Sequence, residues 1–149
     1  MKMQGMEHKI NLPTLVGISA LAWILVNVSH EILGHAGTAV LLGIPVSAVS
    51  TTNASILGDH ITSIGTFRTI MAAGTVMNLV GGAVALMVLV VKKQAQSAAR
   101  YFLWLFCTFS FIIAAMNLVS GSLLGGGDWA VFSRELEPPR TRSSAWAAR

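Results

Sequence analysis

The chain has 149 residues, of which 54% are hydrophobic and 11% are charged, and its mean hydropathy is +0.68. A soluble domain carries about 25% charged residues, so this chain has too few polar side chains to cover a surface in water. The net charge of +4 does not indicate a nucleic-acid partner, because the basic residues gather at the ends of apolar segments and in the C-terminal tail. Such residues suit lipid headgroups, so we predict an all-α membrane protein whose partner is the lipid bilayer, with no nucleic acid.

The first apolar segment covers about residues 14–42. About 29 residues of helix measure roughly 43 Å, against a hydrocarbon core of ~30 Å, so we expect this helix to be tilted or kinked. Pro13 suits a first helical turn, and Gly43 and Pro45 end the helix. The lysines before it give a likeness to a secretory signal, but no small-residue cleavage site follows, so we expect a retained helix.

Residues 46–64 separate the first span from the second. They are rich in Ser, Thr and β-branched residues, with turn signals at Asn53 and Gly58. This composition predicts a short strand pair or an irregular re-entrant loop. At membrane depth, non-helical backbone is tolerated only against protein or water.

Two further spans are predicted over about residues 66–91 and 101–124, giving about three transmembrane helices in all. Each carries a stripe of small residues with an asparagine in it, which is typical of a close-packed helix face. The stripes are Gly74, Asn78, Gly82 and Ala85 in one span, and Asn117, Gly121 and Gly125 in the other. The simplest interpretation of either asparagine is a hydrogen bond between helices.

Three glycines at 125–127 end the third span, and residues 128–137 then have the apolar spacing of a short interfacial helix. We therefore assign residues 1–137 to a single membrane domain and expect a disordered tail over 138–149, which is rich in Pro, Arg, Ser and Ala. The expected location is a multi-pass position in a prokaryotic inner membrane or a plasma membrane. Three spans place five Lys and Arg residues on each side, so charge gives no orientation.

Ionisable residues within the first span are the main sign of chemistry. Glu31 is the only acidic residue between Glu7 and Asp59, and His30 and His35 lie close to it. An ionisable group at this depth costs several kcal/mol. The cluster could be a polar group that satisfies itself, but two histidines and a glutamate together favour a metal site, and neutral imidazole suits zinc.

The histidine spacing departs from the usual zinc-protease motif. In H-E-x-x-H the imidazoles lie at i and i+4 of a helix, whereas His30 and His35 are five residues apart. Positions i and i+5 of an α-helix diverge by about 140°. A π-bulge has close to the needed period, and Gly34 would ease the distortion. Alternatively, Glu31 and His35 form an i, i+4 pair that leaves His30 without a role and the site without an obvious base.

Residues 28–45, VSHEILGHAGTAVLLGIP, resemble the signature helix of the site-2 proteases, which are intramembrane zinc metalloproteases. The β-like segment follows, and residues 73–78 are similar to the family's alanine-glycine-proline-x-x-asparagine stretch. Asn117–Leu118 and Gly127–Asp128 look like the family's asparagine-leucine pair and its late aspartate. The resemblance covers about 100 residues. It departs from the family at the histidine spacing, at Thr75 in place of proline, and in a longer, glycine-padded approach to the aspartate.

The resemblance implies that His30, His35 and Asp128 are zinc ligands, that Glu31 is the general base, and that Asn78 lies near the substrate. Because the first and third spans run parallel, both histidines and the aspartate approach one face of the membrane. An aspartate after three glycines also suits a helix N-cap, so Asp128 keeps two possible roles.

The implied function is hydrolysis of a peptide bond in a transmembrane protein substrate, with residues 46–64 offering an edge for an extended strand. The alternative is a catalytically inactive relative that serves as a scaffold or accessory subunit among membrane partner subunits.

Overall fold

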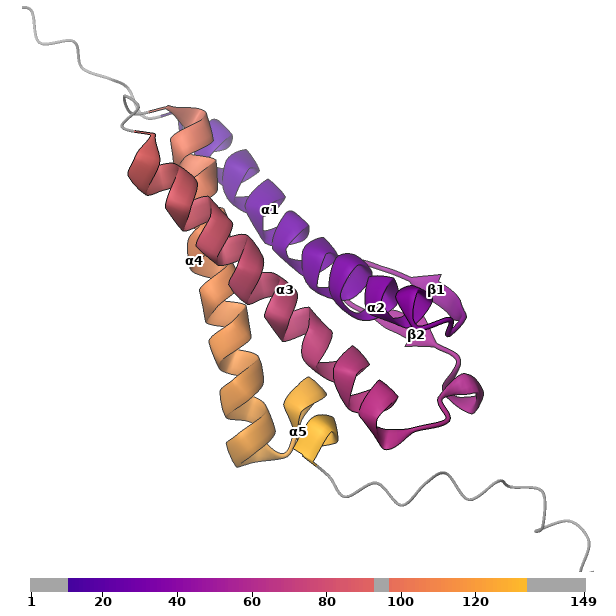
Figure 1. The fold of residues 1–149 in the computed structure, drawn as a ribbon. Coiled ribbons are helices and arrows are strands. Elements are labelled where there is room, and N and C mark those ends of the chain that lie inside the picture. The colour runs from indigo at the N-terminus through magenta and orange to yellow at the C-terminus, as the bar shows by residue number, and fades with distance from the viewer. Residues whose placement is uncertain (1–10, 93–96, 134–149) are drawn as a thin grey trace, which may run out of the picture.

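Three long apolar helical segments form the body of the protein in a computed structural model, which describes residues 11–92 and 97–133 (Figure 1). The segments Leu12–Leu41, Ile64–Val91 and Ala98–Val119 are each long and apolar enough to cross a bilayer. The predicted all-α membrane fold with about three spans is therefore confirmed. The observed helices begin two or three residues before the predicted bounds, because polar capping residues rather than hydropathy decide where each one begins.

Side chains at the helix starts accept hydrogen bonds from backbone amides that the helix itself leaves unpaired. Asn11 caps the first helix, Ser63 the second and Ser97 the third, with N···O distances of 3.3, 3.0 and 3.2 Å. Pro13 lies in the first turn of the first helix, where its missing N–H costs nothing. Each capped start leads into a helix that is long and apolar enough to cross a bilayer.

The first span changes its helical form along its length. It consists of α1 (Leu12–Val28), the π-helix η1 (Ser29–Ala36) and the short α2 (Gly37–Leu41). It ends at Gly43, whose φ of +75° lies in the left-handed region that favours glycine. The predicted distortion near the histidines is thus present as a π-helix.

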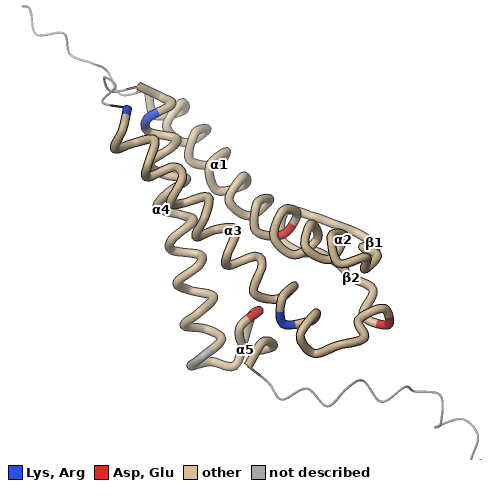
Figure 2. The backbone as a smooth tube through the Cα atoms, in the orientation of Figure 1, with Lys and Arg blue, Asp and Glu red and all other residues tan. Residues whose placement is uncertain are grey.

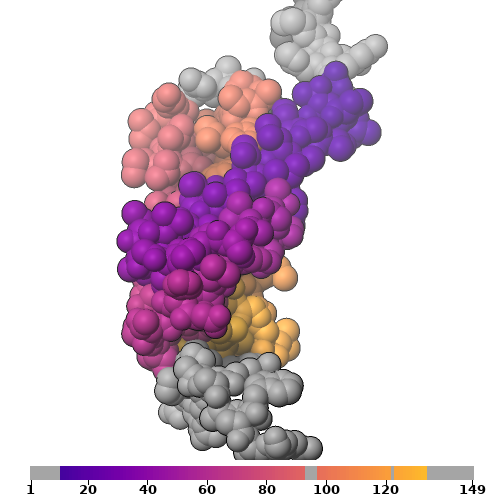
Figure 3. All heavy atoms as spheres, turned by 90° about the vertical axis from the view of Figure 1, so that its right-hand side faces the viewer, coloured from indigo at the N-terminus to yellow at the C-terminus, as the bar shows by residue number. Residues whose placement is uncertain are grey.

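A two-stranded antiparallel hairpin follows, as one of the two sequence interpretations predicted. Its strands are β1 (Val46–Val49) and β2 (Ala54–Ile56), and a one-turn 3-10 helix η2 (Gly58–His60) leads on to α3 (Ile64–Val91). The hairpin packs on the end of the first span through a core of Ala39, Ile44 and Ile70, and it lies on the side of the molecule that faces the viewer in Figure 3. Non-helical backbone is thereby placed against protein.

The stripe of small residues on α3 is buried, as predicted: Gly74, Asn78, Gly82 and Ala85 all face other helices. Gly82 lies against Ser110 and Phe111 of α4 (Ala98–Val119), where an added methyl group would approach both at 3.2 Å. On the other side of α4, the rings of Trp23 and Phe109 meet edge to face at 5.5 Å. These contacts hold α1 and α3 against α4.

Most of the helical surface consists of apolar side chains that the rest of the protein leaves exposed. Only 11%, 28% and 17% of the residues in the most apolar window of the three spans are buried. Large side chains such as Leu41, Met87 and Val91 are more than half exposed. Exposed apolar surface of this extent marks contact with another apolar phase, and lipid supplies it.

The C-terminal part of the described chain folds back onto the bundle. After α4, the short π-helix η3 (Ser120–Leu124) and the glycines at 125–127 reverse the direction of the chain. The next helix, α5 (Gly127–Ser133), then packs against α3. Gly125 and Gly127 have φ values of +66° and +73°, which only glycine adopts readily. The predicted interfacial helix over 128–137 overlaps α5, while its last four residues and the predicted tail over 138–149 lie outside the described residues.

Candidate metal centre

The π-helix η1 brings His30 and His35 together although they are five residues apart. In a π-helix the backbone hydrogen bonds run from i to i+5, so residues at this spacing lie on one face. The two Nε2 atoms are 3.2 Å apart, and both side chains are about 95% buried. His30 therefore belongs to the cluster, contrary to the alternative in which only Glu31 and His35 would form a pair.

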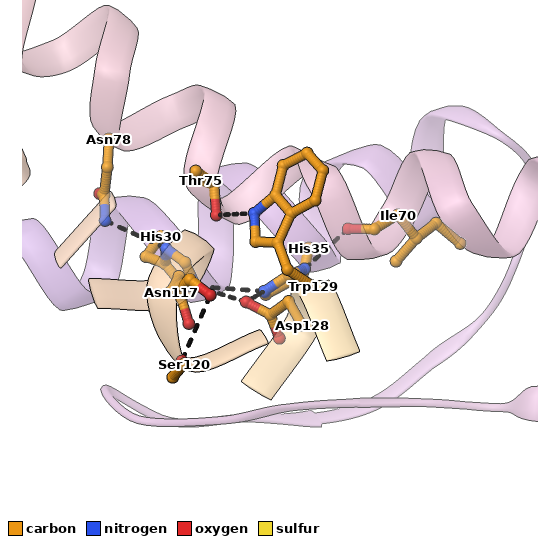
Figure 4. A network of polar contacts seen from close by, with 9 residues as sticks. All are labelled: His30, His35, Ile70, Thr75, Asn78, Asn117, Ser120, Asp128 and Trp129. Atoms are coloured by element: carbon orange, nitrogen blue, oxygen red, sulfur yellow. Dashed lines mark hydrogen bonds and ion pairs between the residues drawn. The ribbon is translucent and has the colours of Figure 1, made fainter. Parts of the chain in front are cut away.

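Asp128, from α5, completes a triangle with the two imidazoles. Its Oδ2 lies 3.1 Å from His30 Nε2 and 3.2 Å from His35 Nε2, as Figure 4 shows. The donor atoms come from η1 and from α5, and His30 and Asp128 are 98 residues apart in the chain. Only the packing of α5 against the bundle brings them together. Asp128 is the second residue of α5 and directs its carboxylate at the histidines.

The hydrogen bonding of His35 requires a proton or a metal ion within the triangle. Its Nδ1 lies 2.7 Å from the Ile70 carbonyl oxygen, which can only accept, so Nδ1 carries a proton. In the neutral ring Nε2 then bears a lone pair, and it faces the Asp128 carboxylate, a second acceptor. Two acceptors 3.2 Å apart are held together by a cation between them, either a proton or a metal ion.

The edges of the triangle have the size that a zinc ion needs. Zinc binds histidine nitrogen and carboxylate oxygen at about 2.0–2.2 Å, and in a tetrahedron this places neighbouring ligand atoms about 3.3 Å apart. The three edges measure 3.1, 3.2 and 3.2 Å. One ion could therefore contact all three atoms.

Two glycines create the space for these groups. A methyl group on Gly34 would lie 2.6 Å from the Gly74 Cα, so the backbones of η1 and α3 touch at this point. A methyl group on Gly74 would lie 2.6 Å from Nε2 of both His30 and His35. Gly74 thus forms the floor of the triangle, and any larger residue would fill it.

Two asparagines surround His30. Asn78 Nδ2 lies 3.1 Å from His30 Nδ1, and Asn117 Nδ2 lies 3.4 Å from His30 Nε2. The Asn78 Oδ1 atom is buried without a partner. Turning the amide by 180°, which exchanges two atoms of similar shape, lets Oδ1 accept from His30 Nδ1–H and leaves Nε2 free to bind a metal.

Asn78 is 1% exposed, and this position favours orientation of the His30 ring over contact with a substrate. Its predicted substrate contact stays a prediction. The hydrogen bond expected between helices is present for both asparagines, and in both cases its partner is His30.

Glu31 lies beside the triangle but makes no contact with it. His30, Glu31 and His35 can place one ligand atom each within 4.8 Å of one another, so the three form a group that could hold a metal ion. Within the described part of the chain the Glu31 carboxylate has no hydrogen bond or ion pair, whereas Asp128 contacts both imidazoles. Glu31 is thus a second carboxylate that remains free at the edge of the site.

The charge state of Asp128 suits a ligand. Burial of its carboxyl group raises its pKa, but the hydrogen bonds and the electrostatic attraction of His30 and His35 outweigh burial and hold the pKa well below its usual range. The carboxylate is therefore ionised at neutral pH, as metal binding requires.

Trp129 fixes the position of α5. Its indole N–H donates to Thr75 Oγ1 at 2.8 Å, and its side chain packs over Gly121. Thr75 is the position at which the chain departs from the proline of the site-2 protease motif, and here its hydroxyl accepts the hydrogen bond that anchors the Asp128 helix.

All of the predicted site residues, His30, Glu31, His35, Asn78 and Asp128, thus lie in one cluster around Gly74. Sequence reasoning did not identify the Ile70 carbonyl, the Trp129–Thr75 hydrogen bond or the floor formed by Gly74. The position of Gly74 in the small-residue stripe was the one available signal. Asp59 and His60 are exposed in η2 and take no part in the cluster.

Comparison of the chain with protein-family models, with curated proteins and with solved structures found no match.

Proposed function

We propose that this protein is a membrane-embedded zinc peptidase of the site-2 protease type, which hydrolyses a peptide bond within the transmembrane segment of another protein. One observation carries the proposal. Two imidazole nitrogens and a carboxylate oxygen converge to within 3.2 Å of one another inside an apolar bundle, with a second, unpaired carboxylate beside them. Placing so many ionisable groups in lipid is costly, and such groups mark a functional site.

His30, His35 and Asp128 would hold the zinc ion. When bound, zinc supplies Lewis acidity and brings the pKa of a coordinated water towards neutrality. The hydrogen bond from His35 Nδ1–H to the Ile70 carbonyl, and the contact of Asn78 with His30, keep both rings turned towards the triangle. Partners of this kind orient metal ligands and are often as important as the ligands.

Glu31 would act as the general base. Its carboxylate is free of other hydrogen bonds in the described part of the chain, so it can accept a proton from the attacking water. The water oxygen forms a bond to the substrate carbonyl carbon, the C–N bond breaks, and Glu31 returns the proton to the leaving nitrogen. Asp128 is assigned the ligand role instead, because its Oδ2 contacts both imidazoles.

The hairpin would present the substrate in an extended form. A peptide bond inside a helix is shielded, so a transmembrane substrate must unwind before it is cut. Within residues 11–92 and 97–133, the strands β1 and β2 pair only with each other, and they pack against η1. An unpaired strand edge next to the site can accept an extended segment by backbone hydrogen bonding.

Metal analysis of protein purified in detergent without chelators tests the proposal. We expect one zinc ion per chain, lost when either His30 or His35 is replaced by Ala. The variant Glu31→Gln should keep its zinc and lose cleavage of a transmembrane substrate. Metal-free wild-type protein contradicts the zinc site, and full cleavage by Glu31→Gln contradicts the role of the base. Zinc binding without any cleavage favours the scaffold or accessory subunit.

A further inference from the structure

An open groove of about 440 Å³ lies beside the metal centre, between α2, α3 and α5. Its lining includes Thr38, three residues after His35, and Phe132, four residues after Asp128. Residues three or four apart lie on one face of a helix. Ala73, next to Gly74, lines it as well. The groove thus begins about one helical turn from the donor triangle.

Among the described residues, Arg68 is the only charged one that lines this groove. Its guanidinium carbon lies 5.7 Å from the centre of the Phe132 ring, and its Nε is buried without a hydrogen-bond partner. In the described part of the chain no carboxylate pairs with it. A buried N–H without an acceptor is costly, so a ligand that reaches the Arg68 side chain could satisfy a donor that the described residues leave without an acceptor.

An arginine near the end of a span often extends into the headgroup region to anchor the helix. Arg68 differs, because Phe132 covers it and its Nε has no contact with solvent. Figure 2 shows other basic positions (blue) at the opposite end of the bundle, where α3 ends before Lys92 and α4 begins close to Arg100. Among the Lys and Arg residues that the structure describes, Arg68 is therefore the one that lies near the metal centre.

We infer that the groove binds the part of the substrate next to the cleaved bond and that Arg68 pairs there with an Asp or Glu side chain of the substrate; the inference rests on the proposed function. A guanidinium binds a carboxylate through two parallel hydrogen bonds. Arg68 precedes Gly74 by six residues, or about 9 Å along the helix axis. An extended peptide covers this distance in about three residues.

The groove wall also limits the residues between the cleaved bond and the acidic side chain. Ala72 and Ala73 line it between Arg68 and Gly74 and offer no charge and little bulk. Apolar side chains therefore suit these positions. The preferred substrate segment is apolar, with one acidic residue about three positions from the cut.

A synthetic apolar peptide tests the inference. A single Asp is moved along it one residue at a time, on either side of the bond that the zinc-loaded protein cuts in detergent, and the products are read by mass spectrometry. We expect kcat/KM to peak when Asp lies about three residues from the cut. A second series carries Lys in place of Asp.

Reversing the charge of Arg68 should reverse the preference. In Arg68→Glu the ratio of kcat/KM for the Asp peptide to that for the Lys peptide should fall by at least about tenfold, the scale of a lost charge-assisted hydrogen bond. Zinc content reports that the variant is folded. Lys92→Glu makes the same charge change at the far end of α3 and should leave the ratio unchanged. An unchanged ratio in Arg68→Glu overturns the inference.

Binding separates this inference from the proposed function. If the wild type binds zinc but cuts no peptide, the peptidase proposal fails. The groove is then tested by binding alone: the affinity of Glu31→Gln for a fluorescent Asp peptide is measured by anisotropy. Binding that weakens about tenfold in Glu31→Gln/Arg68→Glu supports the groove, and binding that does not change overturns it. Loss of the Asp preference when phosphatidylglycerol is added to the micelles assigns Arg68 to a lipid phosphate and also overturns it.

Discussion

Gly74 is the position at which an added side chain would collide directly with both imidazoles of the site. The two Nε2 atoms lie where its side chain would project, each 2.6 Å from the position of an added Cβ. That distance is well inside van der Waals contact, and neither ring can retreat without leaving its partner, Ile70 or Asn78. Glycine at this position is thus a requirement of the site as well as of helix packing.

We expect Gly74→Ala to lower the zinc content of purified protein by at least tenfold, because its methyl group displaces both imidazoles from the triangle. Loss of interactions that only orient metal ligands costs about 10–100-fold in affinity, and displacing the ligands costs no less. Zinc is measured by atomic spectroscopy. Gly17→Ala is the matched control, since an added methyl group there meets nothing within 4 Å. Full zinc content in Gly74→Ala would show that the ion lies elsewhere.

At the scale of the element, the π-helix η1 reconciles a five-residue histidine spacing with one metal ion. The sequence made this distortion predictable, because a regular helix would turn the two imidazoles apart. The docking of α5 was not predictable in the same way. It depends on the Thr75 hydroxyl and the Trp129 indole, and nothing in the sequence pairs two residues 54 positions apart.

Removing one residue from η1 should leave the site intact. A π-bulge accommodates one extra residue in an α-helix, so deletion of Leu33, which is 56% exposed, yields the spacing H-E-x-x-H on a regular helix. We expect the zinc content of this variant to stay within about twofold of that of the wild type.

Deletion of Val76, which is 49% exposed and lies in the regular helix α3, is the matched control. It rotates Gly74 relative to Asn78 by about 100° and should abolish zinc binding. Equal loss of zinc in the two deletions would show that η1 is required for more than the histidine spacing.

At the scale of the whole molecule, hydropathy was sufficient to predict the spans, because lipid imposes a length and an apolar surface on every helix that crosses it. The orientation was not predictable, because the Lys and Arg residues divide equally between the two sides. The alternatives left open for the hairpin needed tertiary contacts to decide, since a strand pair and a loop have the same local sequence. For Asp128 the tertiary contacts place the carboxylate against both imidazoles, and its role as a ligand stays a proposal.

Three spans place the hairpin and the connection before α4 on opposite sides of the membrane. In a Cys107→Ser background, we expect single cysteines at Thr51 and at Ser97, both exposed, to react with a membrane-impermeant maleimide from opposite sides. Right-side-out and inverted vesicles allow the comparison. Labelling of both positions from the same side would mean an even number of crossings between them.

The site also lies deep in the bundle. The midpoint of α3 falls between residues 77 and 78, so Gly74 is about 5 Å from it along the axis. If α3 is centred in a ~30 Å hydrocarbon layer, the triangle lies within that layer. Water for hydrolysis must then reach it through protein, and the groove that begins about one helical turn from the triangle would form part of such a path.

The donor triangle joins the beginning and the end of the described chain, through residues 98 positions apart. An ion bound there would act as a crosslink, and a ligand that binds only the folded state stabilises it by about 4 kcal/mol when its free concentration is a thousand times Kd. The same ion would then close the bundle as well as supply chemistry. An ion at this position would thus tie α5 to the first helix through the Asp128 carboxylate, in addition to the contact of Trp129 with α3.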